Sequence, residues 1–207
     1  MDLRTFARGW LASLIGCLPL LALLLVPELM RSRAGSEQLL MIGTSLLLIL
    51  LTAAFVLAPL MSAWLAPVRG SWEPRTALRA TATVWRGRRG SATVALLTGI
   101  AIYAGGQAVG YWVGAAVPYV SDNPEHLTDP GQPAWIIHYP AYVLQAIVLY
   151  LATTLAVAVY GWRMRSLNLQ RATAITNAPT TSMVLLKRAP SRATPSIVDG
   201  EGRSPGR

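Results

Sequence analysis

The chain has 207 residues, of which 53% are hydrophobic and only 13% are charged, and its formal net charge at pH 7 is +9. Soluble domains are about 25% charged, so this composition is typical of a membrane protein and argues against a soluble domain. The single cysteine, Cys17, excludes an intrachain disulfide, a CxxC redox pair and a cysteine-rich zinc site. The basic excess is almost entirely arginine, and because no nucleic-acid-binding motif accompanies it we expect no nucleic-acid partner.

Four segments are apolar and long enough to cross a bilayer, whose hydrocarbon core of about 30 Å needs roughly 20 apolar residues in a helix. They cover residues 11–30, 39–64, 91–117 and 135–162, and none has a charged residue at its centre. The sequence therefore predicts an all-α, polytopic integral membrane protein. Its four transmembrane helices form one transmembrane domain over residues 1–165.

The first segment contains "LIGC", Leu14 to Cys17, which matches the pattern cleaved by lipoprotein signal peptidase. The apolar run before the cysteine covers only residues 10–15, shorter than the 7–15 residues usual in a signal peptide. The apolar run also continues well past the cysteine. We therefore interpret Cys17 as a small buried residue of the first span.

The connection between the second and third segments, residues 63–90, is basic. A helix beginning near Trp72 would place Leu78, Ala82 and Trp85 on one face. We expect that face to lie among lipid headgroups, with the arginines toward anionic phosphates; a solvated turn is the alternative. The arginines expected at the membrane surface are Arg75, Arg79, Arg86, Arg88 and Arg89.

The third segment carries a stripe of glycines, Gly106, Gly110 and Gly114, each four residues apart. Residues at this spacing share one helix face. In lipid, small residues let two helix backbones approach closely, and this contact replaces the missing hydrophobic force. The stripe therefore predicts a docking surface for another helix, either within the chain or in a second copy.

Two glutamines lie within the predicted spans, Gln107 in the third and Gln145 in the fourth. Because these spans run in opposite directions, both side chains fall at similar depth. We expect them to hydrogen-bond to each other, directly or through a water, as an interhelical polar pair. The alternative is that they line a polar path.

The distribution of positive charge predicts the orientation, because Lys and Arg concentrate in cytoplasmic segments. Sixteen of the 18 Lys and Arg residues fall in the N-terminal segment, the 63–90 loop or the segment after residue 162, against Arg31 and Arg33 elsewhere. Both termini are thus expected in the cytoplasm. The 118–134 loop, which is acidic, should lie outside. Residues 166–207, rich in Pro, Ser and Arg, are expected to form a disordered basic cytoplasmic tail.

Reactive groups are missing from the span interiors, which contain no Asp, Glu, Lys, Arg or His at their centres. Proton-coupled carriers and intramembrane proteases need such groups, so we expect no enzyme, cofactor or metal.

High Arg and Ala content is typical of a GC-rich bacterial genome. We expect a non-catalytic component of the bacterial cytoplasmic membrane that acts through helix–helix contacts, of an accessory, regulatory, immunity, exclusion or defence type. Its partners would be the bilayer with its anionic headgroups, and a homo-oligomer or larger membrane complex. The alternative is a homo-oligomeric pore, holin-like or channel-like, built on the third span.

Overall fold

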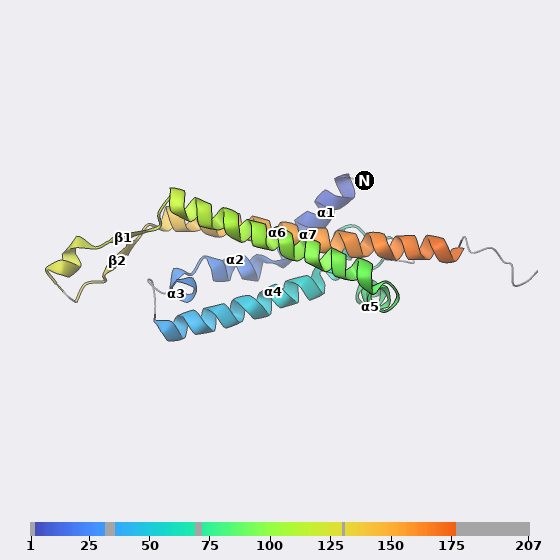
Figure 1. Ribbon diagram of the computed structural model, residues 1–207, viewed down its shortest axis with the longest axis horizontal. Helices are drawn as coiled ribbons and strands as arrows, with labels where there is room; N and C mark the ends of the chain where they lie inside the picture. The colour runs from blue at the N-terminus through green and yellow to red at the C-terminus, as the bar shows by residue number, and fades with distance from the viewer. Residues whose placement is uncertain (1–2, 32–35, 69–71, 130, 177–207) are drawn as a thin grey trace, which may run out of the picture.

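The computed structural model describes residues 3–31, 36–68, 72–129 and 131–176. Most of them are helical, which confirms the predicted all-α class (Figure 1). The helices are α1 (Leu3–Gly16), α2 (Leu18–Leu24), α3 (Pro27–Met30), α4 (Glu37–Leu65), α5 (Ala77–Gly87), α6 (Arg89–Ala116) and α7 (Tyr139–Thr176). Residues 177–207, most of the predicted disordered tail, lie outside the described residues.

A small β-hairpin interrupts the helical architecture between α6 and α7. Strand β1 (Val120–Asp122) pairs antiparallel with β2 (Trp135–Ile137), and a 3-10 turn (Pro124–Leu127) lies between them. The hairpin projects from one end of the helical bundle, and α5 lies at the other end (Figure 1). Because β2 takes up Trp135 to Ile137, the last helix begins at Tyr139, four residues after the start of the predicted span.

Three helices, α4, α6 and α7, are each long and apolar enough to cross a membrane. The first predicted span is not one continuous helix: α1 and α2 meet at a bend of 52° and pass the same test only as a pair. Pro19, at the start of α2, has no backbone N–H to donate and its ring obstructs the preceding turn, so the helix breaks at Cys17. Cys17 itself is buried, as predicted.

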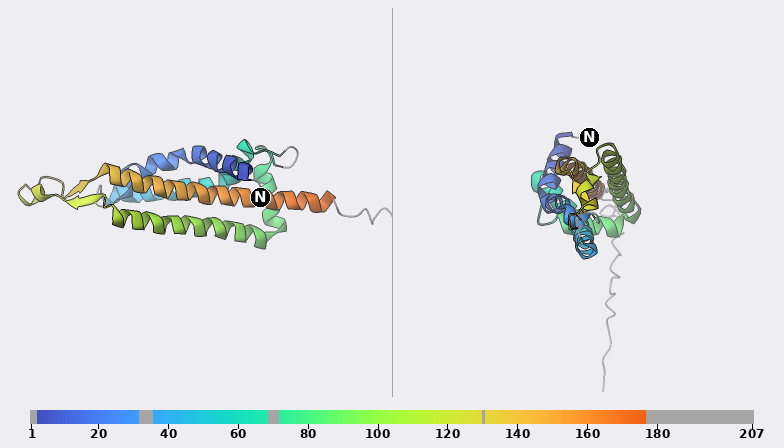
Figure 2. Two further views of the ribbon diagram at one scale, coloured as in Figure 1. Left: turned by 90° about the horizontal axis from the view of Figure 1, so that it is seen from above. Right: turned by 90° about the vertical axis from the view of Figure 1, so that its left-hand side faces the viewer.

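Helix α7 forms the centre of the bundle, with α1 and α2 on one side and α6 on the other (Figure 2). Its 38 residues give it a length of about 57 Å. The prediction of disorder from residue 166 is wrong for residues 166–176, which continue the helix. There the Arg171 guanidinium donates to the carbonyl of Thr83 on α5 (2.8 Å), so the extension of α7 has a helix to pack against.

Small residues bring the helices close together. A Cβ added at Gly161 of α7 would lie 2.8 Å from the carbonyl oxygen of Ala58 on α4, and one at Gly43 of α4 would collide with the carbonyl of Leu29. Such close approach maximises dispersion contact between helices in lipid. The buried core is correspondingly rich in alanine, including Ala54, Ala58, Ala63, Ala92, Ala95, Ala146 and Ala156.

The segment before α5 is anchored in the core by Trp72, which is fully buried and donates its indole N–H to the Ser62 hydroxyl (3.1 Å). A helix beginning near Trp72 was the wrong expectation, because α5 begins at Ala77. The face that α5 buries carries Ala77, Thr81 and Val84.

The predicted apolar face of α5 is divided. Leu78 and Ala82 are exposed, but Trp85 turns toward the bundle and donates to the Tyr160 hydroxyl (3.3 Å). The indole satisfies its N–H within the protein in this position. The helix therefore packs on α4 and α7 along one side and leaves only part of its apolar surface uncovered.

Candidate functional site

The glycine stripe of α6 lies against α7 of the same chain. Added Cβ atoms at Gly106 and Gly110 would collide with the side chains of Ala152 and Leu149, and one at Gly114 would lie 2.7 Å from Nε2 of Gln145. Gly105, next to the stripe, has nothing within 4 Å. Within the described structure, the helix that the stripe meets is α7.

Gln145 is 6% exposed and holds α6, α7 and the end of α3 together. Its amide donates to the carbonyl of Gly110 (2.9 Å), and its side-chain oxygen accepts from Nη2 of Arg31 (2.8 Å). Gln107 is exposed, and no hydrogen bond joins its side chain to another described residue. The predicted direct bond between the two glutamines is therefore not formed: Gln145 has other partners.

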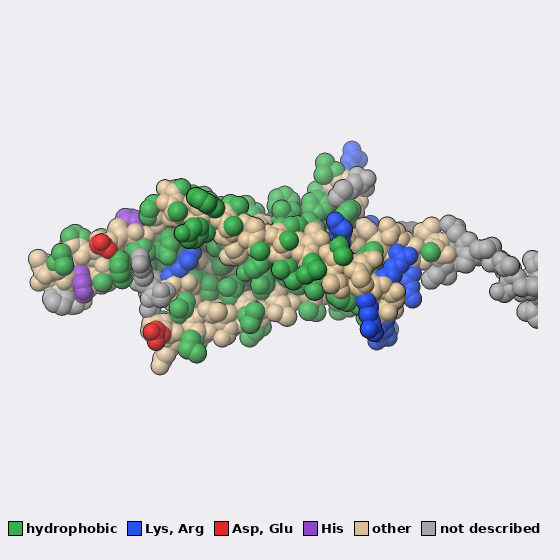
Figure 3. All heavy atoms as spheres, in the orientation of Figure 1, with side chains coloured by type: hydrophobic (Ala, Val, Ile, Leu, Met, Phe, Trp, Pro, Cys, Tyr) green, Lys and Arg blue, Asp and Glu red, His purple; other side chains and the backbone are tan. Residues whose placement is uncertain are grey.

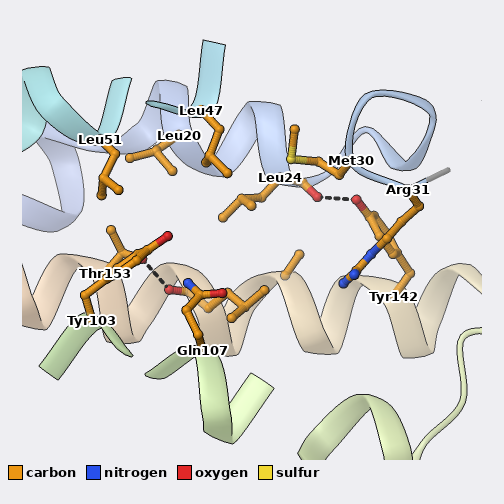
Figure 4. A pocket seen from close by; sticks show the side chains of 12 residues that line it. Leu20, Leu24, Met30, Arg31, Leu47, Leu51, Tyr103, Gln107, Tyr142 and Thr153 are labelled. Carbon is orange, nitrogen blue, oxygen red and sulfur yellow. Dashed lines mark hydrogen bonds between the residues drawn. The ribbon is translucent and has the colours of Figure 1, made fainter. Parts of the chain in front are cut away.

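Arg31 follows α3 and extends toward α7 (Figure 4). Its guanidinium carbon lies 4.9 Å from the ring centroid of Tyr119, within the range of a cation–π contact. Its Nε is buried without a hydrogen-bond partner among the described residues. Sequence reasoning treated Arg31 only as an external charge. The available signal was its position: a basic residue directly after an apolar span, on the side of the molecule where basic residues are scarce.

A cavity of about 140 Å³ lies beside this arginine, lined by residues of α2, α4, α6 and α7. Leucines of α2 and α4 face α7 across it, and Tyr103 and Gln107 border it from α6 (Figure 4). Arg31 and Met30 close one end, where the Tyr142 hydroxyl also donates to the carbonyl of Leu24 (2.6 Å). The site thus combines an apolar wall, a few polar groups and one cation.

The arginines predicted at the membrane surface are all exposed and lie at the far end of the bundle from Arg31. Lys and Arg side chains gather around α5 in Figure 3, whereas Asp, Glu and His side chains occupy the hairpin end. Arg88 also donates to the side chain of Gln170 (3.4 Å). The two ends of the molecule therefore differ in charge.

Among the described residues, no group of three His, Cys, Asp or Glu side chains could hold a metal ion.

The described fold is that of a helical protein. Three of its helices are long and apolar enough to cross a membrane, and the bent pair α1 and α2 would make a fourth span if it is counted as one. Compared with protein-family models, curated protein sequences and solved structures, the chain matches none.

Proposed function

We propose that the chain is a non-catalytic component of the bacterial cytoplasmic membrane, with four spans and both termini in the cytoplasm. In this arrangement α1 and α2 together make the first span, and α4, α6 and α7 make the others. The charge difference between the two ends of the bundle supports the orientation, because positive charge favours the cytoplasmic side. Its role would be accessory or regulatory, or one of immunity, exclusion or defence, exerted through contacts with other membrane helices.

The observation that carries this proposal is the contact of the glycine stripe with α7. A pore built on the stripe would need that face for contacts between copies, and here Ala152, Leu149 and Gln145 cover it. The pore alternative therefore requires α6 and α7 to separate first. The exposed apolar surface of α4, including Leu48, Ile49 and Val56, then remains for lipid or a partner helix.

Native mass spectrometry of the full chain from mild detergent tests this function. We expect a monomer, or a complex of fixed composition with other membrane proteins, and no leakage of dye from vesicles containing the purified chain. A homo-oligomer of the chain accompanied by dye leakage would favour the pore instead. Leakage is measured alongside vesicles containing the Gly106→Leu variant, in which an oligomer built on the stripe would be disrupted.

Cysteine labelling tests the orientation, and the buried Cys17 makes a simple background when replaced with alanine. In that background we expect Thr128→Cys, in the hairpin, to react with a membrane-impermeant maleimide on intact spheroplasts. Ala7→Cys and Thr173→Cys, near the two ends of the described chain, should react only after permeabilisation. All three positions are exposed, so protein packing does not hinder the reagent. Labelling of Thr173→Cys on intact spheroplasts would contradict the proposed topology.

A further inference from the structure

Arg31 is a cation beside a cavity, and an anion bound there would neutralise its charge. Among the described residues no ion pair joins Arg31 to a carboxylate, and the nearby Glu28 accepts instead from the Tyr139 hydroxyl (3.5 Å). Within the described structure, Arg31 contacts a neutral amide and an aromatic ring. A charge in or near the hydrocarbon region is costly and is normally paired. The buried Nε of Arg31 also has no acceptor among the described residues, so the protein itself does not satisfy every donor of this guanidinium.

The position of Arg31 matches the headgroup level of a bilayer. It contacts Tyr119, which lies between α6 and β1, so the guanidinium sits where the bundle meets the hairpin. If α6 crosses the membrane, this is the end of the span. Phosphate groups of the surrounding lipid lie at that depth, and arginine binds them with paired N–H donors.

The cavity is bordered on one side by α4 and α6. Each of these helices packs more extensively on α7 than on the other, and Phe55 of α4 reaches Gly99 of α6 beyond the end of the cavity that is away from Arg31. Leu47 and Leu51 of α4 and Tyr103 and Gln107 of α6 line the cavity between them. A molecule from the bilayer can therefore enter laterally, between α4 and α6, and leave its tail in the lipid.

Gln107 supplies a second polar contact deeper in the cavity. It lies three residues along α6 from Gly110, whose carbonyl binds Gln145, a rise of about 4.5 Å toward the membrane interior. Its exposed amide needs a partner at a depth where water is scarce. The ester carbonyls of a phospholipid lie below the phosphate, whereas a fatty acid has no polar group below its carboxylate.

From this geometry we propose that the cavity binds one anionic phospholipid. Its phosphate pairs with Arg31, an ester carbonyl accepts from Gln107, and one acyl chain runs along Leu20, Leu47 and Leu51 before leaving between α4 and α6. The cavity of about 140 Å³ holds the glycerol region and the start of the chain, and is far larger than one water requires. A net negative lipid is favoured because the ammonium of a zwitterionic lipid would add a second cation beside Arg31.

Lipid add-back followed by native mass spectrometry tests the proposal on the delipidated full chain. We expect one phosphatidylglycerol to bind at low concentration, with phosphatidylethanolamine several-fold weaker and oleate weaker still. Arg31→Gln should weaken phosphatidylglycerol binding at least tenfold, and Arg31→Lys less, because lysine keeps the charge without the paired donors. The matched control is Arg79→Gln, an exposed arginine at the opposite end of the bundle, which should leave this binding unchanged.

A cavity-filling variant separates ligand binding from folding. Leu51→Phe narrows the cavity while leaving Arg31 and Gln145 intact, so it should lower phosphatidylglycerol binding without lowering the thermal midpoint in lipid-free detergent. Equal binding by the parent chain, Arg31→Gln and Leu51→Phe, or equal binding of oleate and phosphatidylglycerol, would overturn the proposal. The inference rests on the proposed transmembrane placement, so carbonate extraction is run first. Release from membranes would contradict the placement, whereas retention without a bound lipid would contradict only the lipid site.

Discussion

Replacing Gly106 with leucine is expected to lower the free energy of unfolding by about 1–3 kcal/mol, the usual cost of overpacking a well-packed contact. The added side chain would collide with Ala152 and force α6 away from α7, its most extensive neighbour. The separation would also stretch the bond from Gln145 to the Gly110 carbonyl. Unfolding in mixed micelles of increasing SDS content, followed by circular dichroism, gives the change.

Gly105→Leu is the matched control, because it makes the same substitution one residue away with nothing within 4 Å of the new Cβ. We expect this variant to be unchanged, or more stable by up to about 1 kcal/mol, since leucine has the higher helix propensity. Equal destabilisation of the two variants would contradict the packing of the stripe on α7. If Gly105→Leu alone were destabilised, the face of α6 that packs on another helix would have to be the one that carries Gly105.

Replacing Trp72 with alanine is expected to cost about 3–5 kcal/mol, the range for removing a large buried aromatic side chain. Trp72 is fully buried, bonds to Ser62 of α4, and closes a short antiparallel bridge with Val68. Without it, the connection to α5 loses its anchor in the core. The same SDS titration measures the loss.

Two further variants test whether the loss of stability comes from burial of the Trp72 indole and from its hydrogen bond. Trp64→Ala, at the end of α4, removes an indole that is 61% exposed, and should cost well under half as much. Trp72→Phe keeps most of the volume but loses the donor to Ser62, so it should cost about 1 kcal/mol for the hydrogen bond plus a small packing term. A Trp72→Ala variant as stable as Trp64→Ala would show that Trp72 does not anchor this segment.

Properties that depend on local composition could be predicted from the sequence. Apolar length located α4, α6 and most of α7, because hydrophobicity over about 20 residues needs no knowledge of neighbours. The four-residue spacing of Gly106, Gly110 and Gly114 likewise defined one helix face. The uneven distribution of arginine along the chain also predicted that the two ends of the bundle differ in charge.

The tertiary structure decided which groups meet. Periodicity shows that a glycine face exists but carries no information about the partner helix, and only packing brought Ala152 and Leu149 to it. The same holds for Gln145, whose partners come from residues 35 and 114 positions away. The burial of Trp72 depends on Ser62 and the core around it. Local sequence signals do not reveal those neighbours, so they indicate only a helix start at this residue.

Arg31 shows this division most clearly. The sequence determined its charge and its place just after an apolar segment, and these suffice to count it toward the orientation. Whether it faces water or turns toward α7 depends on how α3, α6 and α7 surround it, since the cost of desolvating a guanidinium is set by its neighbours in space. Local composition thus fixed which helices are long and apolar enough to cross a membrane, and packing alone placed Arg31 beside a cavity.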